Sequence, residues 1–268
     1  IPDFSFRQDE IGNLSAAIRE MTNSLYDRIA AIESFAADVS HELKNPLTSL
    51  RSAVETLPLA KNEDSKKRLL DIIQHDVRRL DRLISDISDA SRLDAELARA
   101  DAKKLDLEKL LESLVDISSQ VRSKGKTVRV TFNVDRKSAG KGGFAVMGYE
   151  SRIGQIITNL IENARSFVPQ EGGLIAVRLR KNEGNCIVEV EDNGPGIEAE
   201  NIDRIFERFY TDRPNSEDFG QNSGLGLSIS RQIAEAHGGT LEAENVLDDK
   251  GSRRGARFIL TLPEKGQG

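Results

Sequence analysis

Apolar side chains recur every three or four positions from residue 11 to residue 57, with polar side chains between them. Alternating steps of three and four give one apolar face with heptad character, and two extra steps of four shift its phase. The pattern predicts one long helix that ends at Pro58. The stripe consists of Ile11, Leu14, Ile18, Met21, Leu25, Ile29, Ile32, Ala36, Val39, Leu43, Leu47, Leu50, Val54 and Leu57.

A second apolar stripe follows a polar turn at residues 61–64. Its members are Leu69, Ile73, Val77, Leu80, Ile84, Ile87 and Leu93. Two long amphipathic helices joined by a short turn form a hairpin, and each stripe is too long for one partner helix to cover. The pattern therefore predicts an all-α helical hairpin that pairs with a second copy as a dimeric four-helix bundle.

After residue 105 the chain changes to a mixture of helices and alternating strands. Helices are predicted at 107–121, 150–167, 198–209 and 225–237. Strands are predicted at 127–134, 144–148, 174–181, 186–192, 240–245 and 256–263. This order predicts an α+β two-layer sandwich, in which helices cover one face of a sheet.

Charge and cysteine content exclude several classes of protein. The formal charge of −6 and the pI near 5.4 argue against nucleic-acid binding, which usually needs a basic face. Cys186 is the single cysteine, so the chain can form neither an internal disulfide nor a cysteine metal cluster. The sequence has no apolar run of about 18 residues that would predict a membrane span. The chain begins at Ile1 without methionine, and we expect it to be part of a longer protein.

Two polar stretches lie on a predicted helix and directly after a predicted strand. Asn159 and Asn163 are four residues apart, so they share one helix face, and their carboxamide oxygens suit a hard cation such as Mg²⁺. Such asparagines are more often simply solvated. The stretch DNGPGI, residues 192–197, offers a carboxylate that can accept hydrogen bonds from an exocyclic amine. Its glycines would let the backbone approach a flat ligand, although the same letters also fit an ordinary turn.

Two further stretches flank a polar loop. In SGLGLSI, residues 223–229, two glycines open a helix whose free N–H groups could bind phosphate, although a lone GxG also fits a hinge. In FERFYTDR, residues 206–213, the aromatic side chains fit either a core position or an anchor for one end of a lid.

The stretch SHELKNPLTSL, residues 40–50, places His41 beside Glu42 and one turn ahead of Asn45 in the first predicted helix. Pro46 has no N–H for the carbonyl of Glu42, and its ring presses on that carbonyl, so the helix can bend below the histidine. The bend could be used to redirect the histidine, or it could be a static kink.

The order and spacing of these stretches resemble the N, G1, F and G2 boxes of the ATP-binding domain of histidine kinases, whose superfamily includes Hsp90, type II topoisomerases and MutL. SHELKNPL resembles the phosphoacceptor box of the same kinases. Residues 7–21, RQDEIGNLSAAIREM, are similar to the second helix of a HAMP signal-relay module. The resemblance implies a HAMP and signalling helix at 1–30, a dimerisation and phosphotransfer (HisKA) domain at 31–102, and a catalytic ATP-binding (HATPase_c) domain of the Bergerat or GHKL type at 103–268.

The resemblance implies a role for each polar residue of the phosphoacceptor box. His41 is the expected nucleophile toward the γ-phosphorus of ATP, and Glu42 is expected to orient its ring and act as general base. Asn45 occupies the position that aligns water for removing phosphate from a response regulator, and it projects from the same side of the helix as His41. A bifunctional kinase and phosphatase is therefore expected.

For the second domain the resemblance implies a site for ATP and Mg²⁺. Asp192 is expected to hold the adenine amine, Asn163 to coordinate Mg²⁺ and Asn159 to support the phosphates. Residues 210–223 are the expected lid. The other expected nucleotide contacts are Gly194, Gly196, Tyr210, Gly224, Leu225, Gly226 and Leu227.

Three positions depart from the family pattern. Ser166 stands where many members have a lysine, Asn222 where a glycine is common and Tyr149 where an aspartate is common. The first two favour an alternative function, a nucleotide-binding module with mainly phosphatase or scaffold activity. A mechanical ATPase of the Hsp90 or MutL type would need a catalytic glutamate in the helix of the two asparagines, a position that Glu162 lies near, and an additional transducer domain.

The resemblance also implies partners and a location. We expect a homodimer through the helical hairpin, a response regulator of the OmpR type as phosphoryl acceptor, and no nucleic acid. A HAMP segment implies transmembrane segments upstream, so the chain is expected to be the cytoplasmic portion of an inner-membrane sensor.

Overall fold

The computed structural model describes residues 9–97, 102–120, 127–210 and 223–264. The chain divides into two compact units, Ile1–Leu83 and Ile84–Gly268, which we call the helical unit and the sheet unit. None of the helices in the described residues has the length and apolar content needed to cross a membrane.

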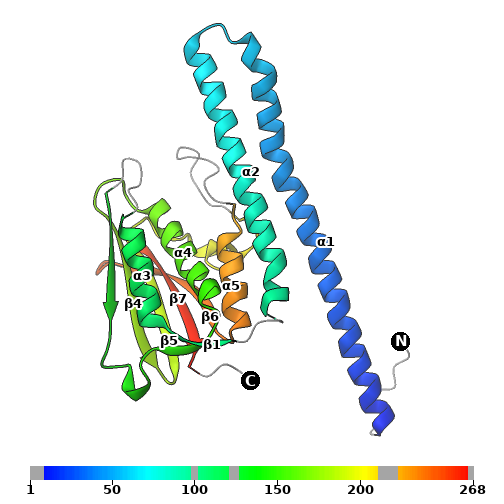
Figure 1. Cartoon of the computed structure of the whole chain (residues 1–268), viewed down its shortest axis with the longest axis vertical. Coiled ribbons are helices and arrows are strands. Elements are labelled where there is room, and N and C mark those ends of the chain that lie inside the picture. The colour runs from blue at the N-terminus through cyan, green and yellow to red at the C-terminus, as the bar shows by residue number, and fades with distance from the viewer. Residues whose placement is uncertain (1–8, 98–101, 121–126, 211–222, 265–268) are drawn as a thin grey trace. The chain divides into compact units, whose positions relative to one another are not determined.

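The predicted helical hairpin is confirmed. Helix α1 spans Glu10–Thr56, a short 3₁₀ helix spans Leu57–Leu59, and α2 spans Glu63–Leu97 (Figure 1). The side chain of Asp9 accepts a hydrogen bond from the backbone N–H of Gly12 at 3.0 Å, and thereby caps the first turn of α1. The turn between the helices is capped in the same way, because Asn62 accepts from the N–H of Ser65 at 2.7 Å.

The apolar stripe of α1 is largely exposed in a single chain. The exposed fraction is 61% for Leu14, 67% for Met21 and 66% for Ile32. Ala53 of α1 and Leu83 of α2 are buried. An exposed apolar stripe of this length is typical of a surface that another helix covers.

The sheet unit is built on a five-stranded sheet with helices on one face (Figure 1). The strand order is β2-β4-β5-β7-β6, in which β2 and β4 are parallel and the other pairs are antiparallel. The strands are β2 (Val128–Val134), β4 (Gly173–Asn182), β5 (Asn185–Asp192), β6 (Thr240–Leu247) and β7 (Arg253–Pro263). The helices are α3 (Leu107–Gln120), α4 (Glu150–Phe167) and α5 (Gly226–Ala236). This arrangement confirms the predicted two-layer sandwich.

The core lies between this helix layer and the sheet. Helix α4 contributes Ile153, Ile157 and Leu160, each fully buried, and β5 contributes Val188 and Val190. Fully burying one such side chain is worth about 1.5–3 kcal/mol relative to leaving it exposed. Helix α4 therefore has a fixed position on the sheet, and this position matters because the helix carries both candidate asparagines.

Two local predictions need correction. A short strand β1 (Lys103–Asp106) pairs antiparallel with β3 (Ala145–Gly148), and its charged KKLD sequence carries no alternation that could have predicted it. Residues 198–209 were expected to form one helix, but the structure has two 3₁₀ helices, Ala199–Asn201 and Arg204–Phe206.

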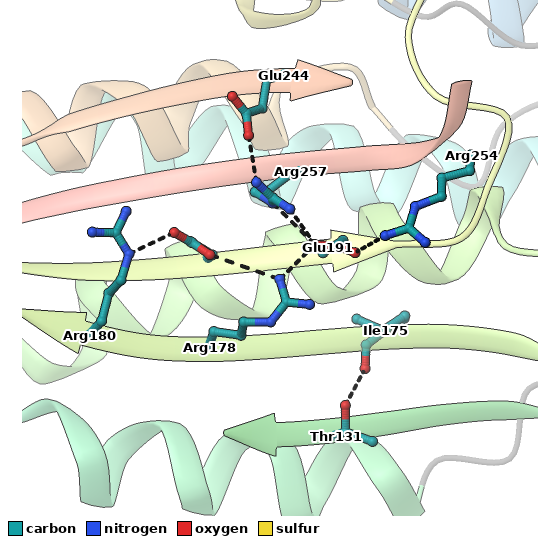
Figure 2. A network of polar contacts seen from close by, with 9 residues as sticks. Thr131, Ile175, Arg178, Arg180, Glu191, Glu244, Arg254 and Arg257 are labelled. Carbon is teal, nitrogen blue, oxygen red and sulfur yellow. Dashed lines mark hydrogen bonds and ion pairs between the residues drawn. The ribbon is translucent and has the colours of Figure 1, made fainter. Parts of the chain in front are cut away.

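The face of the sheet opposite the helices carries a network of ion pairs (Figure 2). Glu191 accepts from Arg178 at 2.6 Å and from Arg257 at 2.8 Å, and Arg257 also contacts Glu244 at 2.8 Å. Burial alone would raise the pKa of the Glu191 carboxyl. The hydrogen bonds and charges of Arg178 and Arg257 outweigh it and hold that pKa below its ordinary value.

Candidate functional sites

The polar residues of the predicted phosphoacceptor box lie on one stretch of α1. His41 and Asn45 are exposed and four residues apart, so they project from the same side of the helix, while Glu42 is half-buried. Pro46 is buried, and α1 continues through it without interruption. The exposed imidazole is therefore open to a reaction partner.

A cation from α2 holds the carboxylate beside this histidine. The Nη2 atom of Arg79 donates to Oε2 of Glu42 at 3.0 Å, and both side chains are about a quarter exposed, at 24% and 26%. Arg79 could not be predicted from the sequence. It lies 37 positions from Glu42, and α2 carries several other arginines in similar charged surroundings. The structure thus gives Glu42 a fixed partner across the hairpin.

In the sheet unit, Asn159 connects α4, which carries both candidate asparagines, to the start of α5. Its Nδ2 group donates to the backbone carbonyl of Gly226 and to Oγ of Ser230, both at 3.2 Å. The start of α5 therefore lies against the Asn159 face of α4. The structure brings together two residues that are 67 positions apart.

The DNGPGI loop begins with a buried carboxyl group. Asp192, at the end of β5, is 6% exposed, and its Oδ1 atom accepts from the N–H of Gly194 at 2.8 Å and of Ala256 at 3.4 Å. Burial raises the pKa of this carboxyl, and the two backbone hydrogen bonds partly oppose that effect. Asp192 is thus a buried acceptor in a fixed orientation.

At two positions of this loop only glycine fits, because a side chain there would collide with neighbouring atoms. A Cβ atom on Gly194 would lie 2.9 Å from the carbonyl oxygen of Phe167, at the end of α4. Gly196 has φ +76°, and a Cβ there would lie 2.6 Å from Oδ1 of Asn245. The loop therefore approaches α4 at Phe167.

The second glycine stretch approaches the same helix two turns earlier. Gly224 has φ +75° and accepts a hydrogen bond from the N–H of Phe209 at 2.9 Å, and Leu225 is buried. In α5 the first intrahelical donor is Ile229, so the N–H groups of Gly226 and Leu227 have no carbonyl to bind within the helix. Such a helix start can accept a phosphate group.

Asn163 lies between these two contacts on α4. Residues 159, 163 and 167 follow at steps of four and therefore line one face, which the two glycine stretches approach at either end. Asn163 is half-buried, and its carboxamide has no hydrogen-bond partner among the described residues.

The donor set at this helix face fits Mg²⁺ bound together with a phosphate ligand. Mg²⁺ usually keeps several waters and takes one or two protein ligands plus phosphate oxygens, so a single open carboxamide oxygen is compatible with it. Within the part of the chain that the structure describes, no group of three or more His, Cys, Asp or Glu could hold a metal ion.

Ser166, which stands where many family members have a lysine, and its neighbour Arg165 both bind groups of the protein itself. Ser166 donates its hydroxyl to the carbonyl of Asn163 at 2.6 Å, so it bonds to its own helix. Arg165 is buried and donates to the carbonyl and hydroxyl of Ser118 on α3, at 2.7 and 2.6 Å. Because successive residues on a helix are turned by about 100°, Arg165 points away from the Ser166 side, and this guanidinium does not substitute for the lysine.

A histidine at the end of α5 binds the start of α4. The Nε2 atom of His237 accepts from the backbone N–H of Tyr149 at 3.2 Å, and its Nδ1 atom lies 2.7 Å from the carbonyl oxygen of Ile233. Because a backbone N–H can only donate, Nε2 is the acceptor of this pair and Nδ1 is the atom that can donate to the Ile233 carbonyl. A Cβ on Gly148 would lie 2.7 Å from this ring, so only glycine fits beside it. Sequence distance concealed this link, since Tyr149 and His237 are 88 positions apart.

The predicted lid lies almost entirely outside the described residues, which exclude residues 211–222 and therefore Asn222. At its start, Tyr210 is half-buried, and the guanidinium of Arg204 lies 5.0 Å from the centre of its ring. A contact of Tyr210 with the nucleotide stays a prediction.

Two family models match the chain. The model of histidine kinase-, DNA gyrase B- and HSP90-like ATPases (HATPase_c) matches residues 148–266, which contain the α4 face and both glycine stretches. The model of the His Kinase A phospho-acceptor domain (HisKA) matches residues 31–96, which contain His41 and Arg79.

Curated relatives match almost the whole chain. It is 77% identical to the sensor protein ChvG of Rhizobium meliloti (strain 1021) over 263 residues, and 74% identical to ChvG of Agrobacterium fabrum (strain C58). These alignments cover 98% of the chain but only 46% and 44% of the two relatives, so the chain spans less than half of their length. The sequences of residues 40–57 and 163–167 by themselves predict the ChvG type, and these matches confirm it.

A solved structure supports the fold. The histidine kinase ThkA, solved in complex with the response regulator protein TrrA, matches 92% of this chain and 66% of its own with a TM-score of 0.66. The sequence identity is 23%, so this likeness shows the architecture alone.

Proposed function

The chain belongs to the sensor histidine kinases of two-component systems, of the ChvG type, and we propose that it uses ATP to phosphorylate His41 and then passes the phosphoryl group to an aspartate of a response regulator. The observation that carries this proposal is the α4 face, where Asn159 and Asn163 lie between a buried carboxyl loop and the start of α5. The two ends of this face suit the two ends of a nucleotide.

The adenine end is proposed at Asp192. Its buried carboxyl is a hydrogen-bond acceptor held by two backbone N–H groups, and the 6-amino group of adenine is a donor. Gly194 and Gly196 would let the loop backbone lie against the flat base. Leu225 is buried within the second glycine stretch and would therefore belong to the phosphate end.

The phosphate end is proposed at the start of α5. The backbone N–H groups of Gly226 and Leu227 and the helix dipole favour a negative charge there. Asn163 would be the protein ligand of Mg²⁺, which neutralises phosphate charge when bound. Asn159 would act indirectly, because its Nδ2 group already ties α4 to α5.

The acceptor chemistry is proposed at His41. An imidazole nitrogen forms a bond to the γ-phosphorus while the bond from that phosphorus to the bridging oxygen breaks, and ADP leaves with the electron pair. The imidazole proton passes to Glu42, whose orientation Arg79 fixes. The product is a phosphoramidate, from which a response-regulator aspartate can take the phosphoryl group.

Phosphatase activity toward the response regulator is proposed as a second activity of the same helix face. Asn45 is exposed on the side of α1 that carries His41, and a carboxamide there can align a water molecule. If the kinase reaction were absent, the alternative would be a nucleotide-binding module with mainly phosphatase or scaffold activity. The hydroxyl of Ser166, turned to its own helix, is the observation that favours this alternative.

The partners and the location are proposed from the family. The exposed apolar stripe of α1 suits a homodimer through the helical hairpin, and a response regulator of the OmpR type would bind near His41. Residues 1–30 would be the end of a HAMP module, residues 31–102 the HisKA domain and residues 103–268 the HATPase_c domain. The chain would then be the cytoplasmic portion of an inner-membrane sensor, anchored by upstream segments.

The test is incubation with γ-labelled ATP and Mg²⁺ of the wild type, His41→Gln and the control variant His75→Gln. We expect acid-labile, alkali-stable label on the wild type and the control, and none on His41→Gln. Label on His41→Gln would place the acceptor elsewhere. Nucleotide binding without any label on the wild type would support the phosphatase or scaffold alternative.

A further inference from the structure

The end of the DNGPGI loop is held by a side chain from β6, which lies two strands from β5 in the sheet. The side chain of Asn245, on the edge strand β6, contacts both backbone groups of Ile197. Its Oδ1 atom accepts from the Ile197 N–H at 2.7 Å, and its Nδ2 group donates to the Ile197 carbonyl at 2.8 Å. The carboxamide thus binds Ile197 as a neighbouring strand would.

Arg253, at the start of β7, supports the same point. Its Nη1 atom donates to the Ile197 carbonyl at 2.9 Å, and its Nη2 atom pairs with Glu198 at 2.7 Å. The carbonyl of Ile197 therefore accepts two side-chain donors, both from the β6–β7 hairpin. Glu198 directly follows the loop, so its pairing holds the chain where it leaves the loop.

The beginning of the loop is anchored at the same place in the hairpin. Ala256 of β7 donates its N–H to Asp192, and Ala256 is also the residue that pairs with Asn245 in the β6–β7 register. A Cβ on the neighbouring Gly255 would overlap the carbonyl oxygen of Asp192, so the hairpin and the loop are in direct contact. Both ends of the loop thus depend on one pair of hairpin residues.

We propose that Asn245, supported by Arg253, is a positioning residue that sets the shape of the adenine end of the nucleotide site and thereby the preference for adenine over guanine. The proposal rests on the proposed ATP site. Asn245 contacts the loop and not the nucleotide. Adenine presents a donor to the Asp192 carboxyl, whereas guanine presents a carbonyl oxygen, which the carboxylate repels. This discrimination requires Asp192 and Gly194 to stay in their present positions.

The proposal predicts different effects on KM and on kcat of autophosphorylation. The phosphate end of the site lies at Gly226 and Asn163, and neither residue contacts the hairpin residues Asn245 or Arg253 among the described interactions. Loosening the loop should therefore raise KM for ATP and leave kcat nearly unchanged. A merely structural role would lower the fraction of folded protein, and hence the apparent kcat, without changing KM.

The experiment compares Asn245→Ala, Asn245→Asp and Arg253→Ala with the wild type. Asn245→Asp keeps the acceptor for the Ile197 N–H but loses the donor to its carbonyl. Arg254→Ala is the matched control, because this neighbouring arginine is 62% exposed and lies 3.9 Å from Glu191. For each variant, autophosphorylation rates are measured against ATP concentration, and ADP and GDP are titrated directly by calorimetry.

For Asn245→Ala we expect KM for ATP to rise about tenfold, as the loss of two hydrogen bonds implies, with kcat within about twofold of the wild type. The ratio of ADP to GDP affinity should fall by a similar factor. Smaller changes in the same direction are expected for Asn245→Asp and Arg253→Ala, and none for Arg254→Ala.

Unchanged KM and unchanged nucleotide preference in Asn245→Ala would overturn the inference, with or without a fall in kcat. If the wild type bound ADP no better than GDP, the proposed adenine site itself would be wrong. The calorimetric titration keeps these failures apart, since it needs no phosphoryl transfer.

Discussion

In the helical unit, His41, Glu42 and Asn45 follow one another within five positions of a single helix, whereas in the sheet unit Asn159 reaches Gly226 across 67 positions of sequence. The positions of the first group along α1 follow from helical geometry, and the one contact to another helix described for it joins Glu42 to Arg79. The second depends on where α4 and α5 pack on the sheet. Substitutions far from the chemistry should therefore disturb the nucleotide site more than the phosphoacceptor.

Apolar side chains are more deeply buried in the sheet unit than in the helical unit of a single chain. Helix α4 buries Leu160 completely, whereas Ile18 on the stripe of α1 is 42% exposed in a single chain. We expect Leu160→Ala to lower the free energy of unfolding of the sheet unit by about 2–5 kcal/mol, through lost apolar contact and the cavity left behind. Denaturant unfolding followed by circular dichroism would measure it.

The matched variant Ile18→Ala should leave the unfolding of the sheet unit unchanged and weaken self-association instead. Sedimentation at several protein concentrations would show the second effect. An equal loss of stability in both variants would contradict the comparison, because it would mean that the two units unfold as one.

The same contrast explains how much could be predicted from the sequence. The periodic stripes predicted the hairpin and the helix and strand order of the sheet unit, and box spacing identified the candidate asparagines and Asp192. Strand β1 was missed because four residues with two lysines show no alternation. Residues 198–209 were predicted as a helix, but they contain two short 3₁₀ helices, and the N–H of Phe209 donates to the distant carbonyl of Gly224.

The residues that hold the site in place were also missed. Arg79, Asn245 and the link from His237 to Tyr149 act on partners between 37 and 88 positions away. Their neighbours in the sequence give no signal, because each contact exists only after the chain has folded. Motifs thus indicate which groups meet the ligand, and tertiary contacts decide which groups orient them.

His237 in the sheet unit and His75 in the helical unit allow a second comparison, in which we expect an intermediate effect on stability. His237 is 9% exposed and accepts from the half-buried N–H of Tyr149, whereas the side chain of His75 on α2 is 33% exposed. His237→Phe should cost about 1–3 kcal/mol of stability, because it leaves that N–H without a partner. His75→Phe should cost clearly less.

Thermal unfolding with and without ADP would test this prediction. Because His237 links α4 to α5, its replacement should also reduce the stabilisation that ADP provides. A variant with normal ADP stabilisation would show that the link is not needed to position the two helices.

The smallest expected effect concerns the ion pairs of the two units. Glu191, with a side chain 13% exposed, is held by Arg178 and Arg257, whereas Glu55 on α1 pairs with Arg51 at 2.8 Å on an open surface and is 63% exposed. Glu191→Gln should lower stability at neutral pH by up to about 1 kcal/mol after allowing for solvent screening, and Glu55→Gln by less.

The pH dependence of this loss follows from the lowered pKa of Glu191. Protonation of a carboxyl with a depressed pKa is harder in the folded state, so its contribution to stability is fully present above the pKa of the unfolded chain and is lost as pH falls through the lower folded pKa. Unfolding curves of wild type and Glu191→Gln should therefore differ at neutral pH and converge in acid. A difference that persisted or grew in acid would mean that Glu191 stabilises the sheet through packing and not through its charge.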